Sequence, residues 1–279
     1  MHRRAFIGML LLLVTGTSLG ADKPLRVGMT PAFLHDQHAL LAVWRDYLQL
    51  RLKRPVEFVP RDRYRETMDL LQQHKLDFAW VCVYPYVAMG NEVKLLAVPV
   101  SQGKPIYRSY LIVPAKDTHT RSIEDLKGAV FAYADPLSNT GYLVPRFDIK
   151  QAGHDPGTFF RRTFFTWSHR KAIEAVASGL VQGAAVDSYV WESLSKLNPG
   201  LAARTRVVKQ SEAFGFPPFV ANRSVGQADF DAMRAAFLDM SRNPAGQSLL
   251  AKLNLDGFIA GSPDLYKSAA RMAATIGQP

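Results

Sequence analysis

The spacing of apolar positions along the chain alternates between the one typical of a strand and the one typical of a helix. This alternation indicates strands and helices that follow one another. Residues 25–29 predict a buried strand, and apolar residues at helical spacing predict a helix over 37–53. The same order recurs with a strand at 56–59, a helix at 64–75 and a buried strand at 77–81. Because strands that alternate with helices usually form a parallel sheet, we predict an α/β fold with mostly parallel strands.

A second unit of the same kind follows. A short helix opens near Tyr84, and Ser122 begins a short capped helix that restarts the alternation. The remaining predicted strands are 95–100, 107–113, 129–133, 162–165, 183–186 and 206–210. The remaining predicted helices are one from Thr140 that Pro145 interrupts, then 169–178 and 188–196, and a helical tail over 227–276 after a stiff aromatic segment at 214–220.

The two units match weakly at an offset of 105 residues. Tyr64 and His169 each begin a predicted helix, and Cys82 and Asp187 each follow the next strand, eighteen residues later. In open α/β sheets, ligands bind beyond the carboxyl ends of strands and beside helix N-termini. We therefore predict that these four residues lie on two facing lobes of a ligand-binding cleft.

The stretch 133–145 carries the strongest signal for a ligand. A predicted strand ends there, and a helix starts after Ser138, Asn139, Thr140 and Gly141. The first N–H groups of a helix have no intrahelical partners and lie at the positive end of the helix dipole, so they suit a phosphate-like oxyanion. An ordinary N-cap is the alternative interpretation, because Ser, Asn and Thr are common at helix starts.

The first 21 residues have a basic start, a short apolar run and small residues at Gly20 and Ala21, the pattern of a cleaved secretory signal peptide. The remaining 258 residues suit a two-lobed α/β protein exported to a bacterial periplasm. The formal net charge of +10 becomes +8 once Arg3 and Arg4 leave with the signal, which favours anionic solutes. Lys and Arg are scattered, without a basic stripe interleaved with aromatic residues, so nucleic-acid binding is not expected.

Three segments, 77–87, 131–145 and 168–187, resemble the phosphonate-binding (PhnD-like) family of periplasmic solute-binding proteins. The resemblance extends over about residues 25–225. It implies a type II periplasmic-binding-protein fold, in which two α/β lobes with a ligand cleft are joined by two crossover strands. It also implies that the protein closes on an anion and delivers it to an ABC importer.

The resemblance implies a set of ligand-binding residues. The helix-start loop of the family matches Ser138-Asn139-Thr140-Gly141, with Asn139 where the family usually has Thr. The amide of Asn139 both donates and accepts hydrogen bonds. Other binding positions of the family fall on Tyr64, Tyr107, His169 and Asp187. Tyr84 is a candidate for the cleft wall, with a place in the core as the alternative.

Cys82 has two interpretations. It is the only cysteine, so it cannot form an internal disulfide, and a buried packing thiol is the first interpretation. The second is a soft ligand for a thiophilic solute such as arsenite, which the resemblance to relatives with a sensory role suggests.

Asp187 restricts the ligand, because an ionised carboxylate repels an anion unless the ligand offers a hydrogen-bond donor. Ser138, His169 and Asp187 also suggest a hydrolytic triad. However, the Gly-x-Ser-x-Gly elbow of α/β hydrolases is absent, and the order Ser, His, Asp differs from theirs. His35 and His38 have no third ligand at a metal-binding spacing. We therefore expect no enzyme, no cofactor and no metal site.

Together these patterns predict a monomeric periplasmic receptor with lobe 1 at 22–110 and 212–279 and lobe 2 at 111–211. The predicted ligand is a small oxyanion of the phosphonate, phosphite or phosphate type, and the predicted partner is an ABC permease in the inner membrane. The alternative is a sensor that holds arsenite through Cys82 and signals to a membrane histidine kinase.

Overall fold

The computed structural model describes residues 23–31 and 38–276. The predicted signal peptide lies outside the described residues. Within them, no helix combines the length and the apolar character needed to cross a membrane.

Lobe 1 is built on a six-stranded sheet with the order β13-β4-β12-β3-β1-β2. Its strands are β1 (Leu25–Met29), β2 (Val56–Pro60), β3 (Phe78–Trp80), β4 (Val93–Val100), β12 (Phe219–Asn222) and β13 (Gly257–Ile259). Its helices are α1 (His38–Leu52), α2 (Tyr64–Gln72), α3 (Val83–Met89), α8 (Gln227–Leu238), α9 (Pro244–Leu253) and α10 (Lys267–Ile276). Three short 3₁₀ turns, Gly90–Glu92, Met240–Arg242 and Pro263–Tyr266, link them.

Lobe 2 is built on a five-stranded sheet with the order β10-β6-β9-β7-β8. Its strands are β6 (Ser109–Pro114), β7 (Val130–Tyr133), β8 (Arg162–Phe165), β9 (Gly183–Asp187) and β10 (Thr205–Gln210). Its helices are α4 (Val144–Gln151), α5 (His169–Ala177), α6 (Ser188–Leu197) and α7 (Pro199–Ala202), with a 3₁₀ turn at Glu124–Leu126 and a π-helical turn at Asn139–Leu143.

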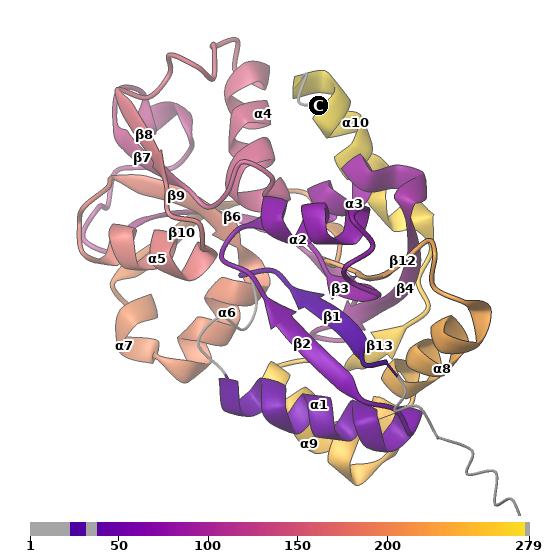
Figure 1. Ribbon diagram of the computed structural model, residues 1–279. Coiled ribbons are helices and arrows are strands. Elements are labelled where there is room, and N and C mark those ends of the chain that lie inside the picture. The colour runs from indigo at the N-terminus through magenta and orange to yellow at the C-terminus, as the bar shows by residue number, and fades with distance from the viewer. Residues whose placement is uncertain (1–22, 32–37, 277–279) are drawn as a thin grey trace, which may run out of the picture.

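The chain passes between the lobes twice. The two passages pair as the short antiparallel strands β5 (Ile106–Tyr107) and β11 (Phe214–Gly215). Figure 1 shows the two lobes side by side, with α10 beside α4, and α10 contacts both α3 of lobe 1 and α4 of lobe 2. The exact lobe boundaries stay a prediction.

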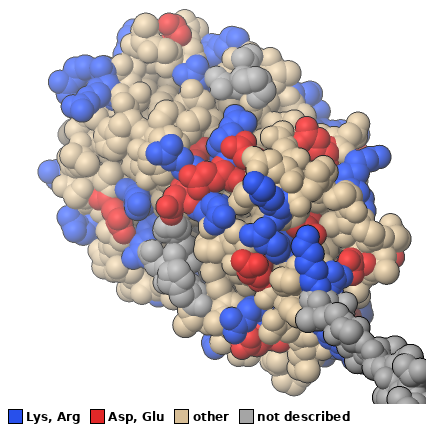
Figure 2. All heavy atoms as spheres, viewed as in Figure 1, with Lys and Arg blue, Asp and Glu red and all other residues tan. Residues whose placement is uncertain are grey.

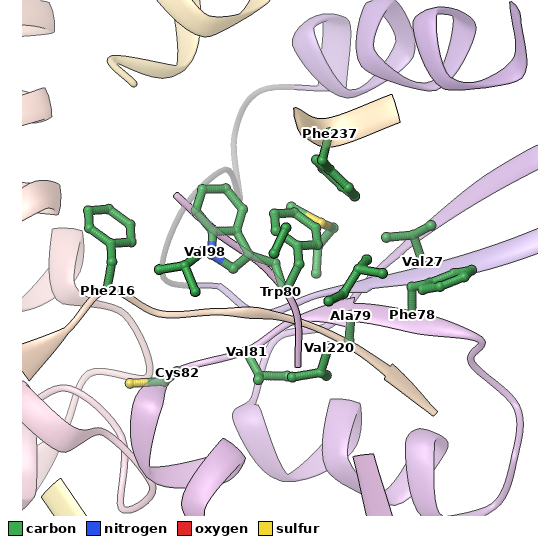
Figure 3. Packing of buried hydrophobic residues seen from close by; sticks show 14 of the residues in the cluster. Val27, Phe78, Ala79, Trp80, Val81, Cys82, Val98, Phe216, Val220 and Phe237 are labelled. Atoms are coloured by element: carbon green, nitrogen blue, oxygen red, sulfur yellow. The ribbon is translucent and has the colours of Figure 1, made fainter. Parts of the chain in front are cut away.

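Aromatic packing forms the centre of lobe 1. Trp44 of α1 is fully buried against Trp80 and Phe219 of the sheet, with ring centroids 6.1 and 5.6 Å apart. In Figure 3, side chains of the same cluster follow one another along β3 from Phe78 to Trp80 and beyond the strand to Cys82. The same hydrophobic cluster includes Leu143 and Tyr189 of lobe 2, so the lobes are closed on one another.

Three predictions of local structure are wrong. The strands are not mostly parallel, because β12 runs antiparallel to β3 and β4, and β6 runs antiparallel to β9 and β10. β6 and β12 enter their sheets directly after the passages between the lobes, at β5 and β11, so the strand–helix–strand connection that produces parallel pairs does not set their direction. The aromatic segment 214–220 contributes strands, and the helical tail is interrupted by β13.

Two short helices also differ from the prediction. Pro145 does not interrupt a helix; it occupies the first turn of α4, where its missing N–H costs nothing. The predicted helix at Ser122 is only a 3₁₀ turn.

Charged side chains of both signs are spread over the face of the molecule that is seen in Figure 2. Figure 2 shows Lys and Arg interspersed with Asp and Glu over the visible face. The formal net charge of +10 is therefore a general bias, and no single cationic patch stands out on this face.

Candidate functional site

The four residues of the 105-residue repeat meet where the lobes face each other. Tyr64 and His169 are the first residues of α2 and α5, and Cys82 and Asp187 immediately precede α3 and α6. All four are at most 1 % exposed. Burial raises the pKa of the Tyr64 phenol well above its usual value, and the neighbouring Cys82 and Asp187 raise it further.

Ser138 is the N-cap of the helix that begins at Asn139. Its Oγ accepts a hydrogen bond from the Gly141 N–H at 2.9 Å and lies 3.2 Å from Nε2 of His169. The Asp187 N–H donates to Nδ1 of the same ring at 3.1 Å, so the ring's proton sits on Nε2 and is donated to Ser138. Burial lowers the pKa of His169 to about 3, which keeps the ring neutral.

This network fixes the direction of the Ser138 hydroxyl. Both of its acceptor positions are taken, by Gly141 and His169, so its own proton is left to donate. Both nitrogens of His169 are paired with protein atoms, so the ring supports Ser138 and has no further N–H to offer a ligand.

Gly141 is required by the close approach of this helix start to its neighbours. A Cβ at this position would lie 2.5 Å from the Ala134 Cβ and 2.8 Å from Cε1 of His169. The absence of a side chain therefore lets the loop pack directly on the His169 ring.

Asn139 and Tyr107 connect the helix start to the crossover between the lobes. The Asn139 side-chain amide donates to the Tyr107 hydroxyl at 3.1 Å. Burial raises the pKa of Tyr107 well above its usual value. The Thr140 carbonyl accepts from the Ser109 hydroxyl at 2.7 Å, which holds the next residue of the loop in place.

Asp187 caps α6 with one carboxyl oxygen only. Its Oδ1 accepts from the N–H groups of Tyr189 and Val190, at 2.8 and 3.3 Å. Its Oδ2 has no hydrogen-bond partner and is buried. Burial raises the pKa of Asp187 to about 7, with Glu192 adding to the rise.

Cys82 lies at the end of β3 with its sulfur directed away from the other labelled core side chains in Figure 3. Burial raises the pKa of the thiol to about 12, although the Asn139 N–H opposes the rise. The residue is therefore a neutral thiol near pH 7, which fits the packing interpretation, because soft metals and metalloids bind the thiolate. Tyr84 is buried in the first turn of α3.

Four polar side-chain atoms of these site residues are buried without a hydrogen-bond partner among the described residues. They are the Tyr64 hydroxyl, Asn139 Oδ1, Thr140 Oγ1 and Asp187 Oδ2. Among the described residues, no Lys or Arg residue is buried as a whole, although the Nε atom of Arg146 is. The four unpartnered atoms thus belong to three neutral hydrogen-bonding groups and one carboxyl group.

Asp135 is a polar residue of this region that sequence reasoning missed. It was interpreted only as the end of a strand, yet its carboxylate accepts from the N–H groups of Tyr64 and Leu137, at 3.3 and 2.8 Å. The one sequence signal was an Asp-Pro pair directly before the helix-start loop.

Two α/β lobes joined by paired crossover strands and closed on one another, with polar side chains buried between them, define the fold of a two-lobed periplasmic solute-binding protein of type II. The family model described as the periplasmic substrate-binding protein of ABC phosphonate transporters matches residues 27–266. The chain belongs to this family.

Individual relatives agree with the family. The phosphonates-binding periplasmic protein of Escherichia coli strain K12 is 24 % identical over 253 residues, which cover 86 % of this chain and 73 % of that protein. A crystal structure of a binding protein component of an ABC phosphonate transporter from Pseudomonas aeruginosa has a TM-score of 0.83 and 23 % identity, covering 91 % of this chain and 87 % of the other. The structure of PhnD1 from Prochlorococcus marinus in complex with methylphosphonate has a TM-score of 0.82 and 20 % identity, covering 92 % and 99 %. None of these three relatives is described as a sensor.

Proposed function

We propose that the protein binds a small tetrahedral phosphorus oxyanion, of the phosphonate, phosphite or phosphate type, in the space between its lobes. The observation that carries this proposal is the set of four buried, unpartnered polar atoms on Tyr64, Asn139, Thr140 and Asp187. Each such atom costs about 1–3 kcal/mol in free energy. A ligand with several oxygen atoms would relieve this cost, and the relatives named for phosphonates point to the same chemistry.

Hydroxyl groups are the main donors to the ligand. The Ser138 proton is directed away from His169 and Gly141, which occupy the oxygen, and the Tyr64 hydroxyl lies within hydrogen-bonding reach of Ser138. The Thr140 hydroxyl has no acceptor among the described residues. The helix that starts at Asn139 adds the positive end of its dipole. His169 then acts on the ligand through Ser138 rather than by touching it.

A proton must lie between Asp187 and the ligand. With the pKa of Asp187 raised to about 7 by burial, either the carboxyl group donates to a ligand oxygen or a P–OH group of the ligand donates to Oδ2. Because none of the described Lys or Arg residues is buried as a whole, nothing among these residues compensates a second ligand charge. We infer that the ligand binds as a monoanion.

The hydrogen-bond directions support a role without catalysis. In a hydrolytic triad, the imidazole accepts the proton of the serine and donates to the carboxylate. Here the imidazole donates to Ser138 and accepts the Asp187 backbone N–H, so no base faces the Ser138 proton.

We further propose that a cleaved signal sends the protein to the periplasm, where it acts as a monomer and passes its ligand to an ABC permease. The alternative sensor role would rest on arsenite bound through Cys82. The buried thiol, with its pKa raised to about 12, argues against that ligand, because arsenic bonds to the thiolate.

Thermal unfolding with phosphate, phosphite, methylphosphonate, sulfate and arsenite tests the proposal. A ligand at a hundredfold excess over its Kd stabilises the folded state by about 2.7 kcal/mol, which raises Tm by about 5–10 °C for a chain of this size. Ser138→Ala should reduce the shift. Ser262→Ala should not, because Ser262 is an exposed N-cap serine far along the chain at Pro263–Tyr266.

Two results would contradict the proposal. A shift with arsenite alone, lost in Cys82→Ser, would favour the sensor. Hydrolysis of a phosphate or carboxyl ester that Ser138→Ala abolishes would show an enzyme instead.

A further inference from the structure

A carboxylate of lobe 2 caps a helix of lobe 1. Asp135, in the loop after β7, is 2 % exposed, and its Oδ2 accepts the backbone N–H of Tyr64, the first residue of α2, at 3.3 Å. The second oxygen accepts the Leu137 N–H within its own loop at 2.8 Å. The hydrogen bond to Tyr64 therefore exists only while the two lobes are closed.

Helix α2 has no cap of its own. The residue in the N-cap position is Arg63, whose side chain makes no capping hydrogen bond and carries no acceptor atom. N-cap positions normally hold Ser, Thr, Asp or Asn, which accept from the first N–H groups of the helix. Asp135 supplies that acceptor from the other lobe. Burial raises the pKa of Asp135, while the N–H groups of Leu137 and Tyr64 and the charges of Arg63 and Arg65 favour the ionised form.

Arg63 makes a second contact between the lobes. Its guanidinium carbon lies 4.4 Å from the centre of the Trp167 ring, which belongs to lobe 2 and also packs on Phe165. Trp167 has a φ of 61°, in the left-handed region that non-glycine residues rarely adopt. Strained residues of this kind persist where the surroundings hold them, and here the strained backbone presents the ring to a cation of the opposite lobe.

We propose that these two contacts form an interlobe latch, Asp135 on the Tyr64 N–H and Arg63 over Trp167, which positions Tyr64 and slows ligand release. Tyr64 carries both the capped N–H and the unpartnered hydroxyl, so the hydrogen bond that joins the lobes also holds the residue whose hydroxyl would face the ligand. The latch rests on the proposed function in that a ligand drives closure. It adds Asp135, Arg63 and Trp167 as positioning residues that lie outside the set of ligand-facing groups.

Stopped-flow measurement of methylphosphonate dissociation and association tests the cap. Asp135→Ala should release the ligand about tenfold faster, which corresponds to about 1.4 kcal/mol, with the association rate changed less than about threefold. Asp135→Asn should restore much of the slow release, because an amide oxygen also accepts. Asp155→Ala is the matched control, since Asp155 accepts only from Gly157 and Thr158 within lobe 2. Equal dissociation rates for wild type and Asp135→Ala overturn the cap.

A double-mutant cycle tests the contact between Arg63 and Trp167. It separates the loss of this contact from an effect of either substitution on the loop that leads to Ser138. Arg63→Ala and Trp167→Ala should each speed release, and the double variant should release the ligand no faster than the quicker single variant. Effects that multiply in the double variant overturn this half of the latch.

Hydrogen exchange at the Tyr64 amide gives a second test of the cap in the closed protein. With methylphosphonate at saturation, the amide should exchange faster in Asp135→Ala than in wild type, and equal exchange overturns the cap. If methylphosphonate, phosphate and phosphite all fail to bind wild type, the proposed function is overturned, whereas binding with equal release and equal exchange in the two proteins overturns the latch alone.

Discussion

Replacing Asp187 by Asn is expected to stabilise the ligand-free protein, and to do so more at pH 8 than at pH 5. Burial raises the pKa of Asp187 from its ordinary value of 3.8 to about 7. Between these values the folded state keeps a proton that the unfolded state has released, so the contribution of this group to stability is complete below about pH 4 and is lost as the pH rises to about 7. Asn carries no charge and keeps an oxygen to accept from Tyr189 and Val190.

The size of the effect follows from the same linkage. Each pH unit within the window costs about 1.4 kcal/mol, so the interval from pH 5 to about pH 7 is worth about 3 kcal/mol, and nothing further is lost at pH 8. Urea unfolding of wild type and Asp187→Asn in buffers free of phosphate measures the difference. Asp155→Asn, at an exposed site, is the control. A stabilisation by Asp187→Asn that is equal at pH 5 and pH 8 would refute a buried carboxyl group that titrates near neutrality.

Three further predictions concern the helix start and the thiol. Gly141→Ala should weaken methylphosphonate binding at least about tenfold, measured by calorimetry, because the new methyl group would overlap Ala134 and the His169 ring. An unchanged affinity would contradict the close packing of the loop on this ring. Cys82 should resist iodoacetamide at pH 8 in the folded protein and react in urea, because its thiol is buried with a pKa of about 12. Modification of the folded protein, measured by mass spectrometry, would show an accessible thiolate and contradict this prediction. Asn139→Thr should alter the order of affinity among phosphate, phosphite and methylphosphonate, because it replaces the amide that donates to the Tyr107 hydroxyl by a shorter side chain with a single hydroxyl. An unchanged order would mean that this amide does not set the preference.

The elements that carry the site were predictable because their signals are local. Helix α2 was predicted at 64–75 and lies at Tyr64–Gln72, and α5 was predicted at 169–178 and lies at His169–Ala177. Apolar spacing and a polar start define such helices within the segment itself. The offset of 105 residues then indicated which strand ends face one another, and the structure brings these residues together.

The parts that were missed depend on contacts between distant segments. β13 has only three residues and becomes a strand because β4, more than 150 residues earlier, offers an edge for pairing. β12 follows two prolines, and it is identified only by its insertion between β3 and β4. The role of Asp135 as the cap of α2 could not be predicted from the sequence either, because the capping side chain of a helix normally belongs to the residue before it. The free energy of such contacts is set by tertiary packing, and propensity within the segment does not report it.

The two lobes present unequal groups at equivalent positions, and we propose that this inequality decides how an anion is recognised. Lobe 1 places a thiol before α3 where lobe 2 places a carboxyl group before α6, and burial keeps the thiol neutral and brings the carboxyl group close to neutrality at pH 7. Among the described residues, no Lys or Arg residue is buried as a whole, and the net charge, +8 once the predicted signal peptide has left, attracts anions over a distance. Different groups of the protein would therefore attract anions from a distance and select among them. In the proposed function, the surface charge raises the encounter rate for every anion, whereas the proton that Asp187 would share with the ligand distinguishes a monoanion from a dianion once the lobes have closed.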